Sequence, residues 1–237
     1  MRAGQDRFDL IYSGRAMEYH ELVSREDAEG NLPKALREIV DLPGKTVVEL
    51  GAGTGRVTRI LAADASRVLA FDRSAHMLDR ARVILAAEMA RNVTLAIGEN
   101  TAIPLRDGCA DVVVEGWSFG HTVSESEGGW DERGDVLLAE TNRLLAAGGT
   151  VILIETMGTG TRTPRPPGVV LPRFFEWLES RRGFSARWIR TDYVFESMAK
   201  AAELVGFFFG SMVEHEVRAD GTVVVPECTG IWWRKKQ

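Results

Sequence analysis

The sequence predicts an α/β fold, a doubly wound sheet of mostly parallel strands with helices on both faces. The first observation is an alternation of short β-branched runs with amphipathic segments from residue 46 onward. The second is that the runs VVEL, VVVE and VILIE are apolar without strict alternation, as expected of strands covered on both sides. Repeated β-α-β units require parallel strands joined by helical crossovers, so the two observations together indicate the fold class.

The elements of this fold follow one another along the chain. Residues 1–43 are helical and mixed in character, and Pro43-Gly44 ends the segment. The expected strands are Thr46–Leu50, Val68–Asp72, Val93–Ile97, Asp111–Glu115 and Thr150–Glu155. The expected helices between them are Gly55–Ala63, Ser74–Ala90 with Ser74 as its N-cap, and Asp131–Ala146, which Gly148-Gly149 ends.

The pattern changes after residue 156. The stretch Gly158–Pro172 is rich in Thr, Pro and Gly and predicts a loop across the surface. Too little chain follows to build a second core, so a lid or substrate loop is favoured over a linker. The remaining expected elements are a helix at Phe174–Arg181, a strand at Arg187–Phe195, a helix at Glu196–Gly206 and a terminal strand at Gly230–Arg234.

Bulk properties narrow the class of protein. A net charge of −5 argues against a protein that binds phosphate backbones, so no nucleic-acid partner is expected. Cys109 and Cys228 lie far apart without metal-ligand spacing, which predicts neither a disulfide framework nor a metal site. The charged start MRAGQDRFDL and the absence of an apolar run of about 20 residues predict a soluble, cytoplasmic protein with no membrane partner. Monomer and homodimer both remain open.

The most informative segment is VVELGAGTGR, residues 47–56, where a strand runs through glycines into a helix. Glycines permit positive φ and let a ligand approach bare backbone. Dinucleotides bind similar turns, but their fingerprint needs Gly or Ala where Arg56 stands. The Glu49 carboxylate before the turn suits a cationic ligand better than a pyrophosphate. Asp72, at the end of the second strand, is placed to accept hydrogen bonds from ribose hydroxyls. A simple tight turn and a helix-flanking Asp are the alternatives.

VVELGAGTGR, followed by LAFDRS, resembles the first two cofactor motifs of class I S-adenosylmethionine-dependent methyltransferases, of the small-molecule type 11 and type 25 kind. Three further matches follow in family order. IGENTAIPLRDG, residues 97–108, is similar to the family's Gly-Asp-Ala, Leu-Pro-Phe and Asp-Gly pattern, with Glu99 and Asn100 in place of the usual Asp and Ala. Residues 111–121 and 144–150 resemble the fourth and fifth motifs, so the resemblance covers about residues 45–156.

The resemblance implies a Rossmann-like sheet of seven strands whose last strand is antiparallel. It also implies one domain over 1–237, with an N-terminal helical cap (1–43), a cofactor-binding core (44–156) and a C-terminal part (157–237) carrying insertions on the substrate side. The family usually has a short hairpin before its last strand, whereas this chain has Glu196–Thr229. That difference predicts an elaborated cap over the site.

The implied cofactor is S-adenosylmethionine, with S-adenosylhomocysteine as product and no metal. The implied binding residues are Tyr19, Glu49, Gly51, Ala52, Gly53, Asp72, Arg73, Met77, Gly98, Glu99, Asn100, Glu115, Gly116 and Trp117. Glu99 would accept a bond from the adenine amino group. Tyr19 is assigned from the spacing Ala16-x-x-Tyr19-x-x-Leu22, which is similar to a family pattern before the first motif, and Tyr12 is its alternative.

His121 is the candidate general base. It follows the fourth strand, where the reactive end of the cofactor is expected, and an unperturbed histidine titrates near neutrality. A base is needed only for an acceptor whose proton has a high pKa. The alternative is a histidine that packs or binds a carbonyl. Trp117 and Phe119 form an aromatic wall or part of the core. Residues 207–209 and 232–233 are interpreted as core packing, with a substrate cage as the alternative.

The predicted function is methyl transfer from S-adenosylmethionine to a small molecule whose identity and acceptor atom the sequence does not show. A nucleic-acid (tRNA) methyltransferase is one alternative, although residues 115–118 lack the Asn/Asp-Pro-Pro-Tyr/Phe motif. A non-catalytic assembly factor that binds S-adenosylmethionine is the other, and burial of His121 away from any cavity would favour it. Arg56 and Glu49 disfavour a dehydrogenase.

Overall fold

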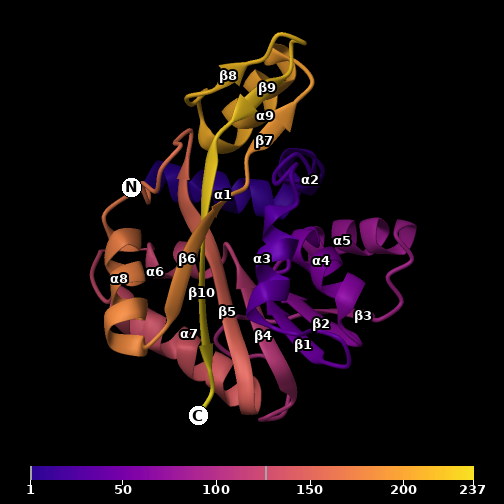
Figure 1. The fold of residues 1–237 in the computed structure, drawn as a ribbon, viewed down its shortest axis with the longest axis vertical. Coiled ribbons are helices and arrows are strands. Elements are labelled where there is room, and N and C mark those ends of the chain that lie inside the picture. Colours follow the sequence, from indigo (N-terminus) through magenta and orange to yellow (C-terminus); the bar gives the residue numbers. More distant parts are fainter. Residues whose placement is uncertain (1, 126) are drawn as a thin grey trace.

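The computed structural model describes residues 2–125 and 127–237, and it is built around a large mixed sheet (Figure 1). This sheet has seven strands in the order β3-β2-β1-β4-β5-β10-β6. The strands are β1 (Thr46–Leu50), β2 (Arg67–Asp72), β3 (Val93–Ile97), β4 (Ala110–Gly116), β5 (Leu145–Thr159), β6 (Ser185–Arg190) and β10 (Glu227–Lys235). β1 to β5 pair in parallel and β10 is antiparallel to both neighbours. The predicted fold class is confirmed.

Helices cover both faces of the sheet because neighbouring strand residues point to opposite sides. Val47 lies in an apolar cluster with residues of α3 (Asn31–Ile39), α4 (Arg56–Asp64) and α5 (Ala75–Ala87). Its neighbour Val48 lies in a second cluster with residues of three other helices. These are α6 (Phe119–Val123), α7 (Trp130–Leu144) and α8 (Val170–Arg182).

The strand order reverses between β1 and β4, since β1 pairs with β2 on one side and with β4 on the other. In open α/β sheets, ligands bind at the carboxyl ends of the strands where this reversal occurs. The topology therefore locates a binding crevice at the ends of β1 and β4.

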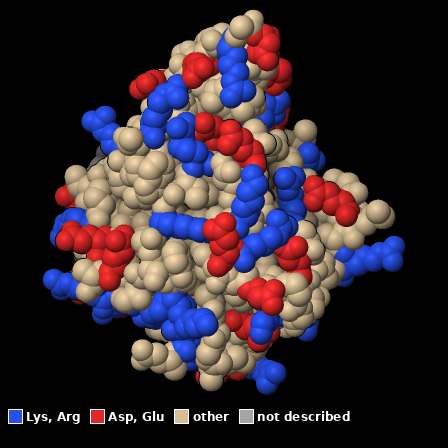
Figure 2. Space-filling model, in the orientation of Figure 1, with Lys and Arg blue, Asp and Glu red and all other residues tan. Residues whose placement is uncertain are grey.

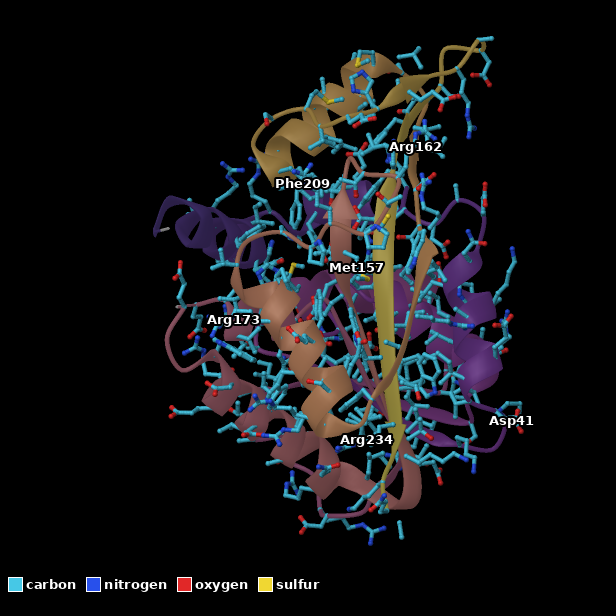
Figure 3. The ribbon with its side chains drawn as sticks, turned by 60° about the vertical axis from the view of Figure 1, so that its left-hand side comes forward. Asp41, Met157, Arg162, Arg173, Phe209 and Arg234 are labelled. Atoms are coloured by element: carbon cyan, nitrogen blue, oxygen red, sulfur yellow. The ribbon has the colours of Figure 1, made fainter. Side chains whose placement is uncertain are left out.

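Two parts of the chain pack against each other beyond this edge. One is the segment before β1, and the other is the segment between β6 and β10, which is called the insertion below. α1 (Arg2–Gly14) and α2 (Ala16–Val23) lie near α9 (Met198–Phe209) and a small sheet of β7 (Tyr193–Phe195), β9 (Val223–Val225) and β8 (Glu216–Val217) (Figure 1). Leu22 of α2 is buried in one apolar cluster with residues of α9 and the small sheet. In Figure 3, Phe209 lies at the end of α9 and Met157 lies on β5 below it.

The strand predicted over Arg187–Phe195 is wrong as a single element, because it divides between the two sheets. β6 ends at Arg190 and β7 begins at Tyr193. Between them the Asp192 carboxylate accepts hydrogen bonds from the Arg190 side chain at 2.8 Å and from the Glu227 amide at 3.0 Å. These local bonds replace the strand ladder and redirect the chain into the small sheet.

Other predicted boundaries shift where pairing partners extend an element. β5 continues to Thr159, beyond the predicted Glu155, because it pairs with β10 as far as Glu227. α8 begins at Val170, inside the predicted loop; Pro172 is tolerated in its first turn, where no amide donor is required. Ser74 caps α5 as predicted, since its hydroxyl accepts a hydrogen bond from the Met77 amide at 3.3 Å.

The aromatic clusters near the C-terminus belong largely to the interior. Trp232 is buried and stacks on Phe175 at 4.2 Å, and Phe208 and Phe209 pack against the insertion's core. Surface charges of both signs are interspersed on the face in Figure 2. Within the described residues, every helix is too short or too polar to cross a lipid bilayer.

The core of the insertion provides a test of its packing. Phe195 is fully buried in this cluster, and truncating a buried Phe to Ala removes apolar contacts and leaves a cavity. We expect Phe195→Ala to lower the free energy of unfolding by about 3–5 kcal/mol in urea denaturation. Val217→Ala, on the 56% exposed position of β8 in the same insertion, should change it by less than about 0.5 kcal/mol. Equal effects of both substitutions would contradict the packing described.

Candidate active site

A cavity of about 290 Å³ lies at the carboxyl ends of β1, β2 and β4. The first turn after each strand contributes to its wall, and α1 and α2 close it from the other side. Its lining residues are Phe8, Tyr12, Tyr19, Gly51, Gly53, Asp72, Arg73, Ser74, Met77, Gly98, Glu99, Asn100, Thr101, Gly116, Trp117, Ser118, His121, Thr122, Glu125 and Leu137.

The turn after β1 needs glycine for backbone conformation and for close packing. Gly51, Gly53 and Gly55 have φ of 73°, 55° and 89°, in the left-handed region where a Cβ is unfavourable. A Cβ on Gly51 would also lie 2.4 Å from the side chain of Ser118. The bare backbone at Gly51 thus admits the loop after β4, which is a second reason for glycine there.

Asp72 connects the turn after β1 to the start of α5 through hydrogen bonds. One carboxylate oxygen accepts from the Gly53 amide at 2.7 Å and the other from the Ser74 amide at 2.8 Å. Burial raises the pKa of Asp72, while these two hydrogen bonds oppose the rise. The carboxylate lines the cavity and retains lone pairs that can accept from ligand hydroxyls.

Trp117 occupies a strained position at the end of β4. Its φ of 55° is uncommon for any residue other than glycine, and its amide donates to the Ile154 carbonyl at 2.8 Å. The guanidinium of Arg56 lies over the indole, 3.4 Å from the ring centroid. Trp117 therefore stands between the cavity and a buried cation.

Arg56, which departs from the dinucleotide fingerprint, has a structural role of its own. Its guanidinium pairs with the buried Glu26 carboxylate, and Glu26 also accepts from the Thr191 hydroxyl at 3.1 Å. Glu26 lies after α2 and Thr191 lies between β6 and β7. One ion pair thus joins the cofactor turn, the N-terminal helices and the insertion.

Two buried glutamates hold the loop that carries His121. Glu115 accepts from the amides of Ser118 at 2.5 Å and Phe119 at 2.9 Å, and Glu155 accepts from the Gly120 amide at 2.5 Å. Burial raises the pKa of Glu115 to about 7. The pKa of Glu155 is raised well above its usual range, first by burial and then by Glu115. Burial therefore favours the protonated form of both carboxyls relative to exposed glutamates.

His121 lies on the cavity wall, half-buried on α6. Its Nε2 atom is 3.1 Å from the hydroxyl oxygen of Tyr12, and the rings of Phe8 and His121 meet edge-on at 4.8 Å. The pKa of Tyr12 is raised well above its usual value of 10, mainly by burial. This phenol therefore stays protonated at neutral pH.

The structure brings most of the predicted residues to one cavity. Those that line it are Tyr19, Gly51, Gly53, Asp72, Arg73, Met77, Gly98, Glu99, Asn100, Gly116, Trp117 and His121. Glu49, Ala52 and Glu115 instead lie buried behind the wall. Glu49 lies beneath the turn with Oε2 unpaired within the described residues, and Glu115 acts on the loop backbone.

Several lining residues were not assigned a site role from the sequence. They are Phe8, Ser74, Thr101, Ser118, Thr122, Glu125 and Leu137. Tyr12 also lines the cavity, although the sequence predicts it only as an alternative to Tyr19. The spacing in the sequence could have indicated Tyr12. It precedes Tyr19 by seven residues, and residues seven apart lie on the same face of a helix. The two helices break at Arg15, yet both rings reach the cavity, 5.7 Å apart.

The residues present fit S-adenosylmethionine. Asp72 and Glu99 offer carboxylates for hydroxyl and amino groups, and the unpaired buried oxygen of Glu49 lies behind the glycine turn, which favours a cationic ligand. When bound, this cofactor supplies an electrophilic methyl group. No group of three or more His, Cys, Asp and Glu side chains within 2–125 and 127–237 is arranged to hold a metal ion.

A doubly wound seven-stranded sheet with β10 antiparallel beside β5, and a cavity at the glycine turn after β1, are features of the class I S-adenosylmethionine-dependent methyltransferases. Residues 48–153 match the family model described as a methyltransferase domain. This part of the chain is therefore similar to a methyltransferase domain.

Relatives agree with this placement. The chain is 34% identical over 110 residues to the uncharacterised protein YafE of Escherichia coli K12, covering 46% of this chain and 49% of YafE. It is 26% identical over 161 residues to the demethylmenaquinone methyltransferase of Lactococcus lactis, covering 65% of this chain and 60% of that protein. The alignments thus span less than two thirds of these relatives.

A solved structure shows the same fold. The S-adenosylmethionine-dependent methyltransferase of Aquifex aeolicus superposes with a TM-score of 0.52, covering 87% of this chain and 93% of that one. At 18% identity, this likeness concerns the fold alone.

The glycine turn can be tested with a matched pair of substitutions. Gly51 and Gly44 both have positive φ, 73° and 79°, but only at Gly51 would a Cβ meet another atom within 3 Å. Gly51→Ala should therefore displace the Ser118 loop and weaken S-adenosylhomocysteine binding at least about 10-fold in calorimetry, which corresponds to about 1.4 kcal/mol. Gly44→Ala imposes similar strain far from the cavity and should leave the affinity unchanged. Equal affinities of the two variants would contradict the packing at Gly51.

Glu49 makes stability depend on pH. Burial is the main cause that raises its pKa from 4.5 to about 7, so the folded state binds this proton more tightly than the unfolded chain. Its contribution to stability is present at low pH and is lost as pH rises from about 4.5 to about 7. Glu49→Gln removes this loss. We expect the variant's unfolding free energy, relative to wild type, to rise by up to about 3 kcal/mol between pH 4.5 and 8 in urea denaturation. A difference that stays constant with pH would refute the burial of a titrating carboxyl here.

Proposed function

We propose that this protein transfers a methyl group from S-adenosylmethionine to a small-molecule acceptor. The single observation that carries the proposal is that one cavity holds both the glycine turn with Asp72 and Glu99 and the His121 side chain. Cofactor-binding groups and a candidate base therefore face the same enclosed space.

The proposed roles follow from position. Asp72 binds the ribose hydroxyls, and Glu99 with Asn100 lies where the adenine would bind. The backbone at Gly51, Gly53 and Gly116 lines the methionine portion. Glu49 and Glu115 act from behind the wall. Glu49 lies beneath the glycine turn with one carboxyl oxygen unpaired within the described residues, and Glu115 holds the loop after β4.

His121 is proposed to take the proton released by the acceptor. It lies on the cavity wall, not buried away from it, which argues against the reading as a non-catalytic assembly factor. Positioning and exclusion of water account for much of the rate enhancement in such a transfer. α1 and α2 close the cavity with Phe8, Tyr12 and Tyr19, and so restrict water.

A small acceptor is favoured over a nucleic acid. The cavity is closed by aromatic side chains of the N-terminal helices, and the face in Figure 2 mixes positive and negative side chains without a continuous basic stripe. The demethylmenaquinone methyltransferase among the relatives is named for a small-molecule acceptor, which supports the same class.

Calorimetric titration with S-adenosylmethionine and S-adenosylhomocysteine tests the proposal. We expect both to bind, and Asp72→Asn to weaken binding about 10- to 100-fold, because charge-assisted hydrogen bonds contribute about 1.5–3 kcal/mol. Asp79→Asn makes the same charge change at an exposed position of α5, where the side chain pairs with Arg82 on the helix surface, and this variant should bind normally. If neither compound binds the wild-type protein, the proposed function is wrong.

A further inference from the structure

The end of the cavity near α1 is walled by aromatic rings. Phe8 and Tyr12 are nearly parallel, at 16° and 6.2 Å, and Tyr12 meets Tyr19 edge-on at 5.7 Å. Phe208 of α9 packs against Phe8 at 5.3 Å and against Tyr19 at 5.7 Å. The insertion therefore supports this wall from behind. Flat rings in such arrangements pack well against another flat ring.

The inward polar atoms at this aromatic end are the Tyr12 hydroxyl and the His121 imidazole. The Tyr12 hydroxyl oxygen and His121 Nε2 are 3.1 Å apart and partly buried. Thr122 adds a hydroxyl, whereas the Glu125 carboxylate is exposed at the rim. A ligand group bound here meets hydrogen-bonding partners of both kinds, a donor and an acceptor.

The cavity lining offers an anion one arginine and no lysine. Arg73 is the sole Lys or Arg among the described lining residues, and its charge acts on the neighbouring Asp72 carboxyl. Arg56 is separated from the cavity by Trp117 and pairs with Glu26. At the aromatic wall, a phosphate or carboxylate acceptor would lose its hydration with no Lys or Arg to replace it, which disfavours anionic acceptors.

We propose that the acceptor is an uncharged aromatic ring bearing a hydroxyl group. The proton of this hydroxyl group leaves through Tyr12 to His121. The inference rests on the proposed methyl transfer and adds the acceptor class and a second catalytic residue. Its basis is the Tyr12–His121 contact beside an aromatic wall that contains neither Lys nor Arg.

The proton path is balanced at each atom. The acceptor hydroxyl donates to the Tyr12 oxygen, and the Tyr12 hydroxyl donates to His121 Nε2. As the acceptor oxygen bonds to the methyl carbon, the methyl–sulfur bond breaks and its electron pair stays on sulfur. The acceptor proton passes to Tyr12 while the Tyr12 proton passes to His121. Tyr12 ends unchanged, and His121 ends as an imidazolium that returns its proton to water.

This path agrees with the environment of Tyr12. Burial and the nearby carboxyls of Asp72 and Glu155 disfavour the phenolate, so Tyr12 conducts a proton and does not act as the base. Its ring position is also held from the backbone, because the Ser74 hydroxyl donates to the Tyr12 carbonyl at 2.7 Å.

The acceptor class is tested with compounds that share one ring system. The wild-type protein and S-adenosylmethionine are incubated with uncharged one- and two-ring phenols including 1-naphthol, with 1-aminonaphthalene, with 1-naphthol-4-sulfonate and with phosphoethanolamine. Methylated products are quantified by mass spectrometry. We expect kcat/KM for at least one neutral phenol to exceed that of the amine, the sulfonate and phosphoethanolamine by about 100-fold.

Preference for the amine or for either anion overturns the acceptor class. If S-adenosylhomocysteine binds in calorimetry but no phenol in the panel is methylated, the inference fails while the proposed function stands. If S-adenosylhomocysteine does not bind, the proposed function itself fails.

Substitutions test the proton path separately. Tyr12→Phe keeps the ring and removes the hydroxyl, and we expect kcat with the phenol to fall about 100-fold at pH 7, as for loss of general-base catalysis, with the S-adenosylhomocysteine Kd changed less than about 3-fold. His121→Asn should have a similar effect. The double variant should be within about 3-fold of either single variant, because both belong to one path.

The pH dependence separates this role from a structural one. A phenol with pKa near 10 ionises in solution at high pH and then needs no base, so the wild-type to Tyr12→Phe ratio should shrink from about 100 at pH 7 to below about 10 at pH 10. Multiplicative losses in the double variant, or a ratio independent of pH, would overturn the path.

Discussion

Buried carboxylates that accept backbone amides shape the whole site. Asp72 bonds the Gly53 and Ser74 amides, and Glu115 and Glu155 bond the amides at 118–120. The loops after β1, β2 and β4 would otherwise carry unpaired amide groups at the strand-order reversal. Because these carboxylates supply the missing acceptors, three loops from separate strands keep a fixed relation and enclose one cavity.

A second constraint joins parts of the chain that are distant in sequence. The Arg56–Glu26 pair links the cofactor turn to the N-terminal helices, and Thr191 extends the link to the insertion. Removing one partner of a buried ion pair leaves an uncompensated charge, which typically costs about 3–5 kcal/mol. The helices that close the cavity are therefore coupled to the turn beneath it, and Trp117 lies at the junction.

The aromatic wall shows how the insertion serves the site without lining the cavity itself. Phe208 packs against Phe8 and Tyr19, so α9 determines where those rings stand. The core of the insertion in turn includes Leu22 of α2. The insertion thus positions rings of the cavity wall through contacts that lie outside the cavity.

The sequence by itself determined the parallel core and the glycine turn, because apolar runs, helical spacing and glycine are local signals. The motif residues could be located from the predicted strands, because Asp72 ends β2, Glu99 lies shortly after β3 and His121 lies in the short helix that follows β4. Only the tertiary structure decided that Arg187–Phe195 divides between two sheets, that Glu49 and Glu115 lie behind the wall, and that Tyr12 meets His121. These outcomes depend on contacts between residues far apart in the chain, such as Asp192 with Glu227 and Tyr12 with His121, and no local pattern encodes them.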